Sequence, residues 1–150
     1  MKKNFLSKVC MVIATMMLMP ISTQASNDKP ISVAQLPQAA QKTLSAHFSK
    51  NKVALAKMES GLFEKSYEVV FTNGDKVEFD GNGKWKELSC TQTSVPATLI
   101  PVTIRNYVKT HYSNTRILEL ERERRHYDVK LSNRLKLKFD KNGKLLDIED

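Results

Sequence analysis

An internal repeat constrains the fold more than any other feature of the sequence. Residues 67–90 align with residues 127–150 at an offset of 60, and nine of the 24 positions are identical. In the first copy these positions are Tyr67, Val69, Asn73, Lys76, Phe79, Asp80, Asn82, Gly83 and Lys84. Upstream, Pro37 aligns with Pro101 at an offset of 64, so the first copy has four additional residues, which we place near Gly61. A duplicated unit of about 60 residues is therefore expected.

Each copy begins with a helical pattern and continues with strands. Apolar residues recur every four positions in residues 36–48 and again in 100–112, which places them on one helix face. Residues 67–71 and 76–79 alternate apolar and polar side chains, a pattern typical of half-buried antiparallel strands. The second copy repeats this alternation.

Weaker strand patterns complete the unit. They cover residues 53–58 and 85–90, with counterparts in 117–120 and 145–148. The predicted fold class is α+β, a tandem repeat of one helix plus a four-stranded antiparallel meander. One unit of this size buries little apolar surface, so we expect the two copies to pack together.

The turns between the strands contain Asn and Gly. Asn73-Gly74 predicts a tight hairpin, and because Asn133-Arg134 stands there in the second copy, we expect Asn133 to take the positive φ angle. The turns that begin at Asp80 and Asp140 have oxygen ligands but lack the alternating acids of a calcium loop. We interpret them as structural turns.

The first 25 residues predict an export signal. Lys2, Lys3 and Lys8 precede an apolar run of 11 residues, Val9 to Met19, and small residues lead to a cleavage site near Ala25. No later stretch approaches the roughly 20 apolar residues of a membrane-spanning helix. We therefore expect a periplasmic or secreted protein without a transmembrane segment in the mature chain.

The predicted organisation is a signal peptide over residues 1–25, a first unit over 26–90 with a short N-terminal tail, a linker over 91–94 and a second unit over 95–150. The 24 Lys and Arg exceed the 16 Asp and Glu to give a net charge of +8, which falls to +5 without the three leader lysines. Nucleic acid is not expected as a partner outside the cytoplasm. Cys90 is the single cysteine beyond the signal, and either a half-buried thiol or a thiol that pairs with another chain fits it.

The sequence shows no catalytic, metal or cofactor site. Ser26 and Ser49 begin Ser-x-x-Lys motifs, but the Ser-Asp-Asn and Lys-Thr-Gly elements of penicillin-recognising enzymes are missing. His47, His111 and His126 lack the spacing of zinc ligands. We therefore predict a protein that is not an enzyme, with no catalytic residues, no metal ligands and no cofactor.

Four segments together carry a family resemblance. They read LPQAAQKTLSAHF over 36–48, YEVVFTNGDKVEFDGNGKWKEL over 67–88, VPATLIPVTIRNYV over 95–108 and YDVKLSNRLKLKFDKNGKLLDI over 127–148. The sequence resembles the PepSY-like family of exported bacterial proteins, described as similar to the beta-lactamase inhibitor protein. The resemblance implies a tandem α+β architecture, export, no cofactor and a role in binding or restraining other proteins.

A basic surface is predicted on the second copy. If its apolar strand residues face the helix, the intervening lysines must stand on the other sheet face, near three arginines. These residues are Lys130, Lys136, Lys138, Arg122, Arg124 and Arg134. In the first copy, Trp85 is expected either on the open face near Val70, as a binding anchor, or in the core if a bulge reverses its register.

Two functions from different classes follow. The first is a non-enzymatic binding module that engages, and restrains, an envelope protein or enzyme through its open sheet faces and loops. The alternative is a binder or sensor of anionic envelope ligands through the basic sheet face of the second copy. An envelope hydrolase is disfavoured because the sequence offers no nucleophile and base.

Overall fold

The computed structural model describes residues 27–150, so the predicted export signal and its cleavage site lie outside the described residues. Within them, α1 (Gln38–His47) and α2 (Val102–His111) are each followed by four strands. The strands are β1 (Asp28–Ile31), β2 (Val53–Ser60), β3 (Lys65–Phe71), β4 (Lys76–Asp80), β5 (Trp85–Ser89), β6 (Ile117–Arg122), β7 (His126–Leu131), β8 (Lys136–Asp140) and β9 (Leu145–Glu149), with a short 3-10 helix at Val33–Gln35. No helix in this part of the chain is long and apolar enough to cross a membrane.

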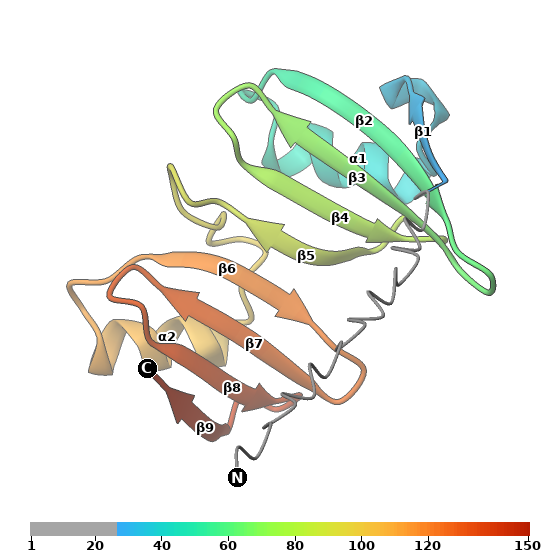
Figure 1. Ribbon diagram of the computed structural model, residues 1–150. Helices are drawn as coiled ribbons and strands as arrows, with labels where there is room; N and C mark the ends of the chain where they lie inside the picture. Colours follow the sequence, from blue (N-terminus) through green and yellow to red (C-terminus); the bar gives the residue numbers. More distant parts are fainter. Residues whose placement is uncertain (1–26) are drawn as a thin grey trace, which may run out of the picture.

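All the described strands form one antiparallel sheet in the order β1 to β9 (Figure 1). The α+β class is confirmed, whereas the division into two repeated units stays a sequence-based description. The β5 strand pairs with β6, with Leu88 opposite Leu120, so the two copies join edge to edge. β1, which pairs with β2, was not predicted and has no counterpart in the second copy.

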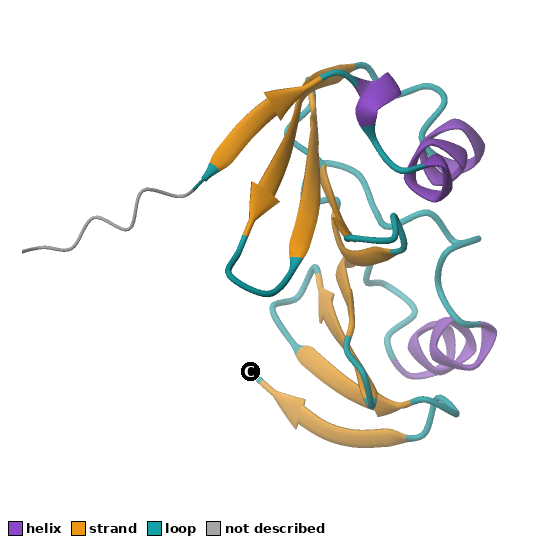
Figure 2. Cartoon of the chain, turned by 90° about the vertical axis from the view of Figure 1, so that its right-hand side faces the viewer, coloured by secondary structure: helices purple, strands orange, loops and turns teal. Residues whose placement is uncertain are grey.

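Both helices cover the same face of the sheet, and the other face is open and curves away from them (Figure 2). A buried apolar row runs beneath the helices, from strand to paired strand across the junction of the copies. Its members are Ala56, Val69, Val77, Leu88, Leu120, Val129 and Leu137, each at most 4% exposed. The core is therefore continuous from one half of the molecule to the other.

Turn glycines set the distance between the sheet and the helices. Gly83, in the β4–β5 turn, has φ +80°, and a Cβ there would lie 2.7 Å from Pro37 Cβ and 2.9 Å from Ala40 N at the start of α1. Gly143 similarly approaches Thr103 at the start of α2. These positions require glycine both for the left-handed backbone and for the close contact.

The expectation for the second copy's hairpin was wrong by one residue. Arg134, not Asn133, takes the positive φ angle, at 76°. The physical reason is that Asn133 keeps another role: its Oδ1 accepts a hydrogen bond from Leu135 N, as Asn73 Oδ1 does from Asp75 N. Asn133 therefore closes its turn with a side-chain hydrogen bond, as Asn73 does. The next residue, Arg134, which aligns with Gly74, adopts the left-handed conformation.

The connection between the copies is held by hydrogen bonds. Thr93 Oγ1 donates to Asp75 Oδ2 at 2.7 Å, and the Arg116 side chain donates to the Thr93 carbonyl. Cys90 is 1% exposed, and burial, followed by the charge of Asp75, raises the pKa of its thiol to about 12. The thiol therefore stays protonated and cannot reach another chain without local opening, which favours a packing role.

Candidate binding surface on the open face of the sheet

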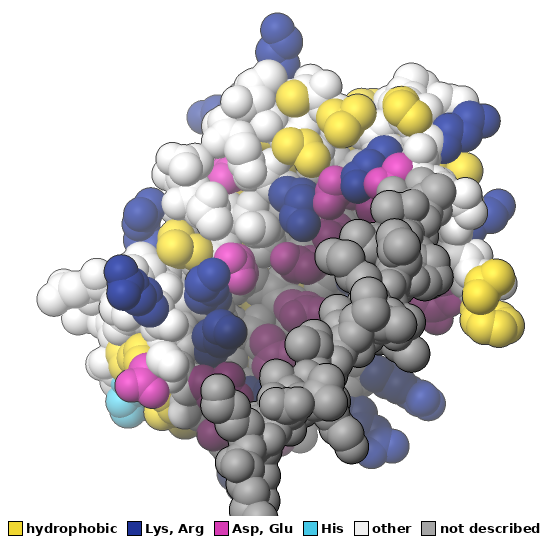
Figure 3. Space-filling model, viewed as in Figure 1, with side chains coloured by type: hydrophobic (Ala, Val, Ile, Leu, Met, Phe, Trp, Pro, Cys, Tyr) yellow, Lys and Arg dark blue, Asp and Glu magenta, His cyan; other side chains and the backbone are white. Residues whose placement is uncertain are grey.

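Five carboxylates form an unbroken line across the open face. Strand pairing sets Glu68 opposite Glu78, Glu78 opposite Glu87, Glu87 opposite Glu121 and Glu121 opposite Asp128. We call these five residues, on β3 to β7, the acidic row. Figure 3 shows acidic side chains gathered along the middle of this face, with basic side chains around them.

Lysines neutralise the two ends of the acidic row but not its centre. Lys57 Nζ lies 3.2 Å from Glu68, Lys76 Nζ 2.9 Å from Glu78, and Lys138 Nζ 3.9 Å from Asp128. Within the described residues, neither Glu87 nor Glu121 has an ion-pair partner within 4 Å. The junction of the two copies therefore carries uncompensated negative charge.

The pKa values of Glu87 and Glu121, the two carboxyl groups without an ion-pair partner, are both raised. Burial, and then the charge of Glu78, raises the pKa of the Glu87 carboxyl. Burial and a hydrogen bond with Glu123 raise the pKa of Glu121, with further contributions from Glu87 and Asp128. A cationic group placed between them would relieve this repulsion.

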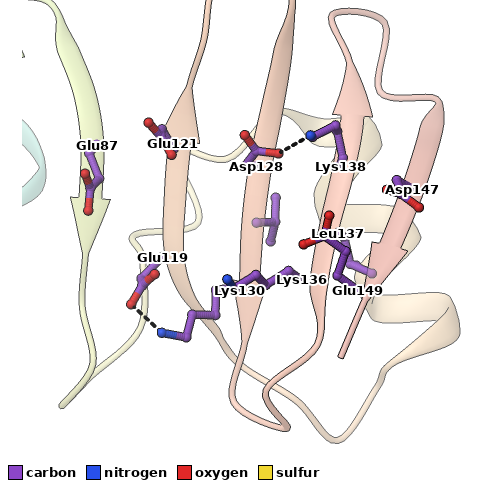
Figure 4. Close-up of a pocket in the computed structure, with 11 residues that line it drawn as sticks. Glu87, Glu119, Glu121, Asp128, Lys130, Lys136, Leu137, Lys138, Asp147 and Glu149 are labelled. Atoms are coloured by element: carbon purple, nitrogen blue, oxygen red, sulfur yellow. Dashed lines mark hydrogen bonds and ion pairs between the residues drawn. The ribbon is translucent and has the colours of Figure 1, made fainter.

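The curvature of the sheet makes a hollow beside the acidic row in the second copy (Figure 4). Its volume is about 300 Å³. The charged side chains that line it are Glu87, Glu119, Glu121, Asp128, Asp147, Glu149, Lys130, Lys136 and Lys138. Six carboxylates and three lysines therefore share this hollow.

The predicted cationic face is thus wrong in its charge, although its lysines are on the open face as expected. Lys130 Nζ is held 2.9 Å from Glu119 Oε1, and Lys136 stands opposite Glu149 on β9. The error arose because the prediction counted the lysines of β7 and β8 without the carboxylates that β5, β6 and β9 bring beside them.

The three predicted arginines do not gather on this face. Arg122 lies over the Trp85 ring, 4.3 Å from its centroid, and donates a hydrogen bond to the Trp85 carbonyl. Arg124 is exposed in the β6–β7 connection, and Arg134 is exposed in the β7–β8 turn at the opposite end of the strands.

Trp85 is half-buried and packs against the core. A register shift in the pairing of β4 with β5 sets it opposite the fully buried Phe79. Of the two predicted alternatives, the structure therefore shows the second: an irregular register turns Trp85 towards the core rather than towards the open face. Val70 lies between the buried Val69 and Phe71 and therefore does point to the open face, opposite Lys76.

The turn aspartates and the three histidines each have a partner within the described residues. Asp80 Oδ1 accepts hydrogen bonds from Asn82 N and Lys84 N, so its carboxylate caps its own turn, and Asp140 does the same. Among residues 27–150, no group of three His, Cys, Asp or Glu side chains is arranged to hold a metal ion. His47 bonds to Thr98, His111 packs on Tyr107 and His126 contacts Asp128.

Sequence reasoning missed the acidic row because it weighed the charge of one copy at a time. A signal was present: Glu68, Glu78 and Glu87 occupy polar positions of the period-two segments. Their alignment into one line depends on the strand registers and on the joining of β5 to β6, which alternation alone does not specify.

The acidic row predicts a pH-dependent effect on stability. Because the pKa of Glu87 is raised in the folded state, the carboxyl favours the fold only when protonated, and this contribution is lost as the pH rises through the folded pKa. Glu87→Gln should therefore stabilise the protein at pH 7, by up to about 1 kcal/mol, and this gain should vanish as the pH falls to about 4.

Urea unfolding at pH 7 and pH 4 measures this effect. Glu78→Gln is the matched control, since it removes the ion pair with Lys76 and should give no gain at pH 7. A Glu87→Gln variant that is no more stable than the wild type at pH 7, or equally stabilised at both pH values, would contradict the electrostatic assignment.

The fold and this surface define a class: an α+β protein with helices on one sheet face and a charged, concave open face. The family model described as "Putative beta-lactamase-inhibitor-like, PepSY-like" matches residues 23–60 and 65–147. The chain belongs to this family, which confirms the resemblance. No curated protein matches the chain.

Solved structures from Bacteroides share the fold. One is from Bacteroides thetaiotaomicron, described as a "putative calcium-regulated periplasmic protein", with 55% identity and a TM-score of 0.81 over 82% of this chain and 97% of that one. Another, a Bacteroides vulgatus periplasmic protein of the DUF2874 family, has 49% identity and a TM-score of 0.81 over 84% and 99%. A third, from Bacteroides vulgatus and of unknown function, has 38% identity and a TM-score of 0.77 over 82% and 99%. These relatives are described as periplasmic, and the family is inhibitor-like rather than a known enzyme family.

Proposed function

We propose that the protein is a periplasmic binding module without enzymatic activity, which engages another envelope protein through its open face. The acidic row carries the proposal, because it spans both copies on a concave surface that no element of the described chain covers. The partner's contact surface is then cationic, with Lys or Arg side chains that pair with Glu87 and Glu121.

The inhibitor-like family supports a restraining role for this binding. A partner enzyme that docks a basic segment in the hollow of about 300 Å³ would have that segment withheld from its substrate. Fold similarity alone does not fix function, so the charge pattern of this chain, rather than the family name, selects the partner chemistry.

The arrangement of charges on the open face also weighs against the alternative, in which the second copy binds anionic envelope ligands there. Lys130 is paired with Glu119 and Lys138 approaches Asp128, so an anion in the hollow would have to compete with carboxylates. The binding experiment described next should be carried out both with and without calcium, because one relative is described as calcium-regulated. The proposal uses no bound metal.

Affinity capture from periplasmic extract, followed by titration of the purified captured protein, tests the proposal. The double variant Glu87→Gln, Glu121→Gln should weaken binding at least tenfold, since close charge pairs at interfaces have coupling energies above about 1.5 kcal/mol. The control Glu64→Gln, Asp150→Asn removes two exposed carboxylates that are outside the acidic row and should leave binding unchanged.

Three outcomes would contradict the proposal. Equal affinity for the wild type and the Glu87→Gln, Glu121→Gln variant would remove the acidic row from the interface. Loss of binding only when Lys130, Lys136 and Lys138 are changed to Glu would favour an anionic ligand. A strict calcium requirement would replace direct charge complementarity by a metal-dependent contact.

A further inference from the structure

A second surface lies at one end of the sheet. Because neighbouring strands are antiparallel throughout, the β2–β3, β4–β5, β6–β7 and β8–β9 connections emerge at the same end, on the right and lower right of the sheet in Figure 1. We call this the hairpin end. With strands about 4.8 Å apart, the connections extend over roughly 30 Å.

The β2–β3 connection projects an apolar tip from this end. Leu62 and Phe63 are 95% and 96% exposed, far more than the other exposed large apolar side chains. The hairpin from Val53 to its partner Phe71 spans 19 residues, whereas the hairpin from Ile117 to its partner Leu131 spans 15. The four additional residues are therefore in this hairpin, as expected, and the family match leaves out residues 61–64. The tip therefore lies outside the buried core and in a segment that the family match does not cover.

Basic side chains are distributed along the hairpin end, from the tip to the β8–β9 connection. Six lie in the four connections or at the first residue of a following strand, and all six are exposed: Lys65, Lys84, Arg124, Arg125, Lys141 and Lys144. Within residues 27–150, none of them forms an ion pair within 4 Å. Of the acids in these connections, Glu64 and Glu123 are exposed, while Asp80 and Asp140 cap their own turns.

We propose that the hairpin end docks on an anionic phospholipid surface, with Leu62 and Phe63 inserted among the lipids and the Lys and Arg side chains of the hairpin end on their headgroups. An exposed Leu-Phe pair without neighbours is costly in water and gains by burial at an interface. Two apolar side chains alone bind a membrane weakly, and nearby basic residues add the second signal that stable attachment needs.

The spread of the charges favours a lipid surface over a protein pocket. The six basic residues lie on four separate connections, so they match a broad anionic plane better than one compact site. The acidic row lies on a different surface, the open face, which stays accessible to a protein partner while the hairpin end is docked. This inference does not depend on the proposed function.

Binding to vesicles tests the inference. The protein is recovered from the periplasm, and its mass is measured to verify that the predicted export signal has been removed. This matters because the apolar run Val9–Met19 would itself bind lipid. Cosedimentation is compared for phosphatidylglycerol and phosphatidylcholine vesicles. The wild type should bind the former and be released by high salt, and Leu62→Ser, Phe63→Ser should weaken this binding at least tenfold.

Charge variants locate the contact. Arg124→Glu, Arg125→Glu at the hairpin end should weaken binding by roughly fivefold or more for each residue. Lys50→Glu, Lys52→Glu makes the same charge change in the α1–β2 connection, at the opposite end of the sheet, and should leave binding within twofold. Leu55→Ser, a partly exposed leucine of β2, is the apolar control and should bind as the wild type does.

Three results would overturn the inference: no binding to phosphatidylglycerol vesicles, equal loss from charge reversal at the two ends, or full binding by the Leu62→Ser, Phe63→Ser variant. Since the changed side chains are exposed, circular dichroism should show an intact fold for each variant. Loss of a captured protein partner by Leu62→Ser, Phe63→Ser, with no vesicle binding by the wild type, would assign the tip to a protein pocket instead.

Discussion

Replacing Gly83 with alanine is expected to lower the free energy of unfolding by at least about 3 kcal/mol. The left-handed backbone alone costs an alanine about 1–2 kcal/mol. The added Cβ would also lie 2.9 Å from the Ala40 backbone nitrogen and 2.7 Å from Pro37 Cβ, so α1 would have to move away from the sheet.

Gly74→Ala separates the two contributions. Gly74 has φ +88°, but a Cβ there would have no neighbour within 4 Å, so this variant should lose only the backbone cost. Urea unfolding of both variants measures the difference. Equal losses for Gly83→Ala and Gly74→Ala would show that the contact with α1 is not close enough to matter.

Leu120→Ala is expected to cost about 2–5 kcal/mol, as large-to-small changes in well-packed cores do. Leu120 is fully buried and stands opposite Leu88 where the two copies join. Because the apolar row continues through this junction, we expect the chain to unfold in one transition, with amide protection falling in both halves. Leu146→Ala, at a position 54% exposed, should change stability by no more than about 0.5 kcal/mol.

Hydrogen exchange and urea unfolding, measured on the same variants, test whether the two halves unfold together. If Leu120→Ala reduced protection only in residues 95–150, or if unfolding showed two separate transitions, the halves would be independent domains that happen to share a sheet edge. The size of the loss tests the packing, and its distribution along the chain tests the cooperativity.

Local sequence patterns predicted the helices and strands, whereas the charge of the open face depends on the pairing of strands that are distant in the sequence. The helices begin directly after Pro37 and Pro101, and the strands of the repeat follow the predicted alternation, because periodicity reports which side of one element is buried. The charge of the open face depends on which strands are neighbours. That information is absent from any single element, so the predicted cationic face was wrong although each lysine was placed correctly.

Two further differences have local causes that pattern reading does not resolve. β1 contains Pro30, which cannot donate to a ladder, so its sequence does not indicate a strand, yet it pairs at the edge of the sheet. Trp85 is half-buried because the pairing of β4 with β5 shifts by one residue, and a one-residue shift moves a side chain to the other face.

The pairing of β5 with β6 also has a consequence for self-association. Two separate sheets, β1 to β5 and β6 to β9, would expose four unpaired strand edges, each a template for aggregation. Joining them removes two, and in the described chain the remaining edges are β1 and β9. β1 carries Lys29 and Pro30, and β9 carries Asp147 and Glu149, residues that discourage a further strand from adding. The pairing of β5 with β6 thus gives a wide concave surface, while the described chain keeps only two unpaired strand edges.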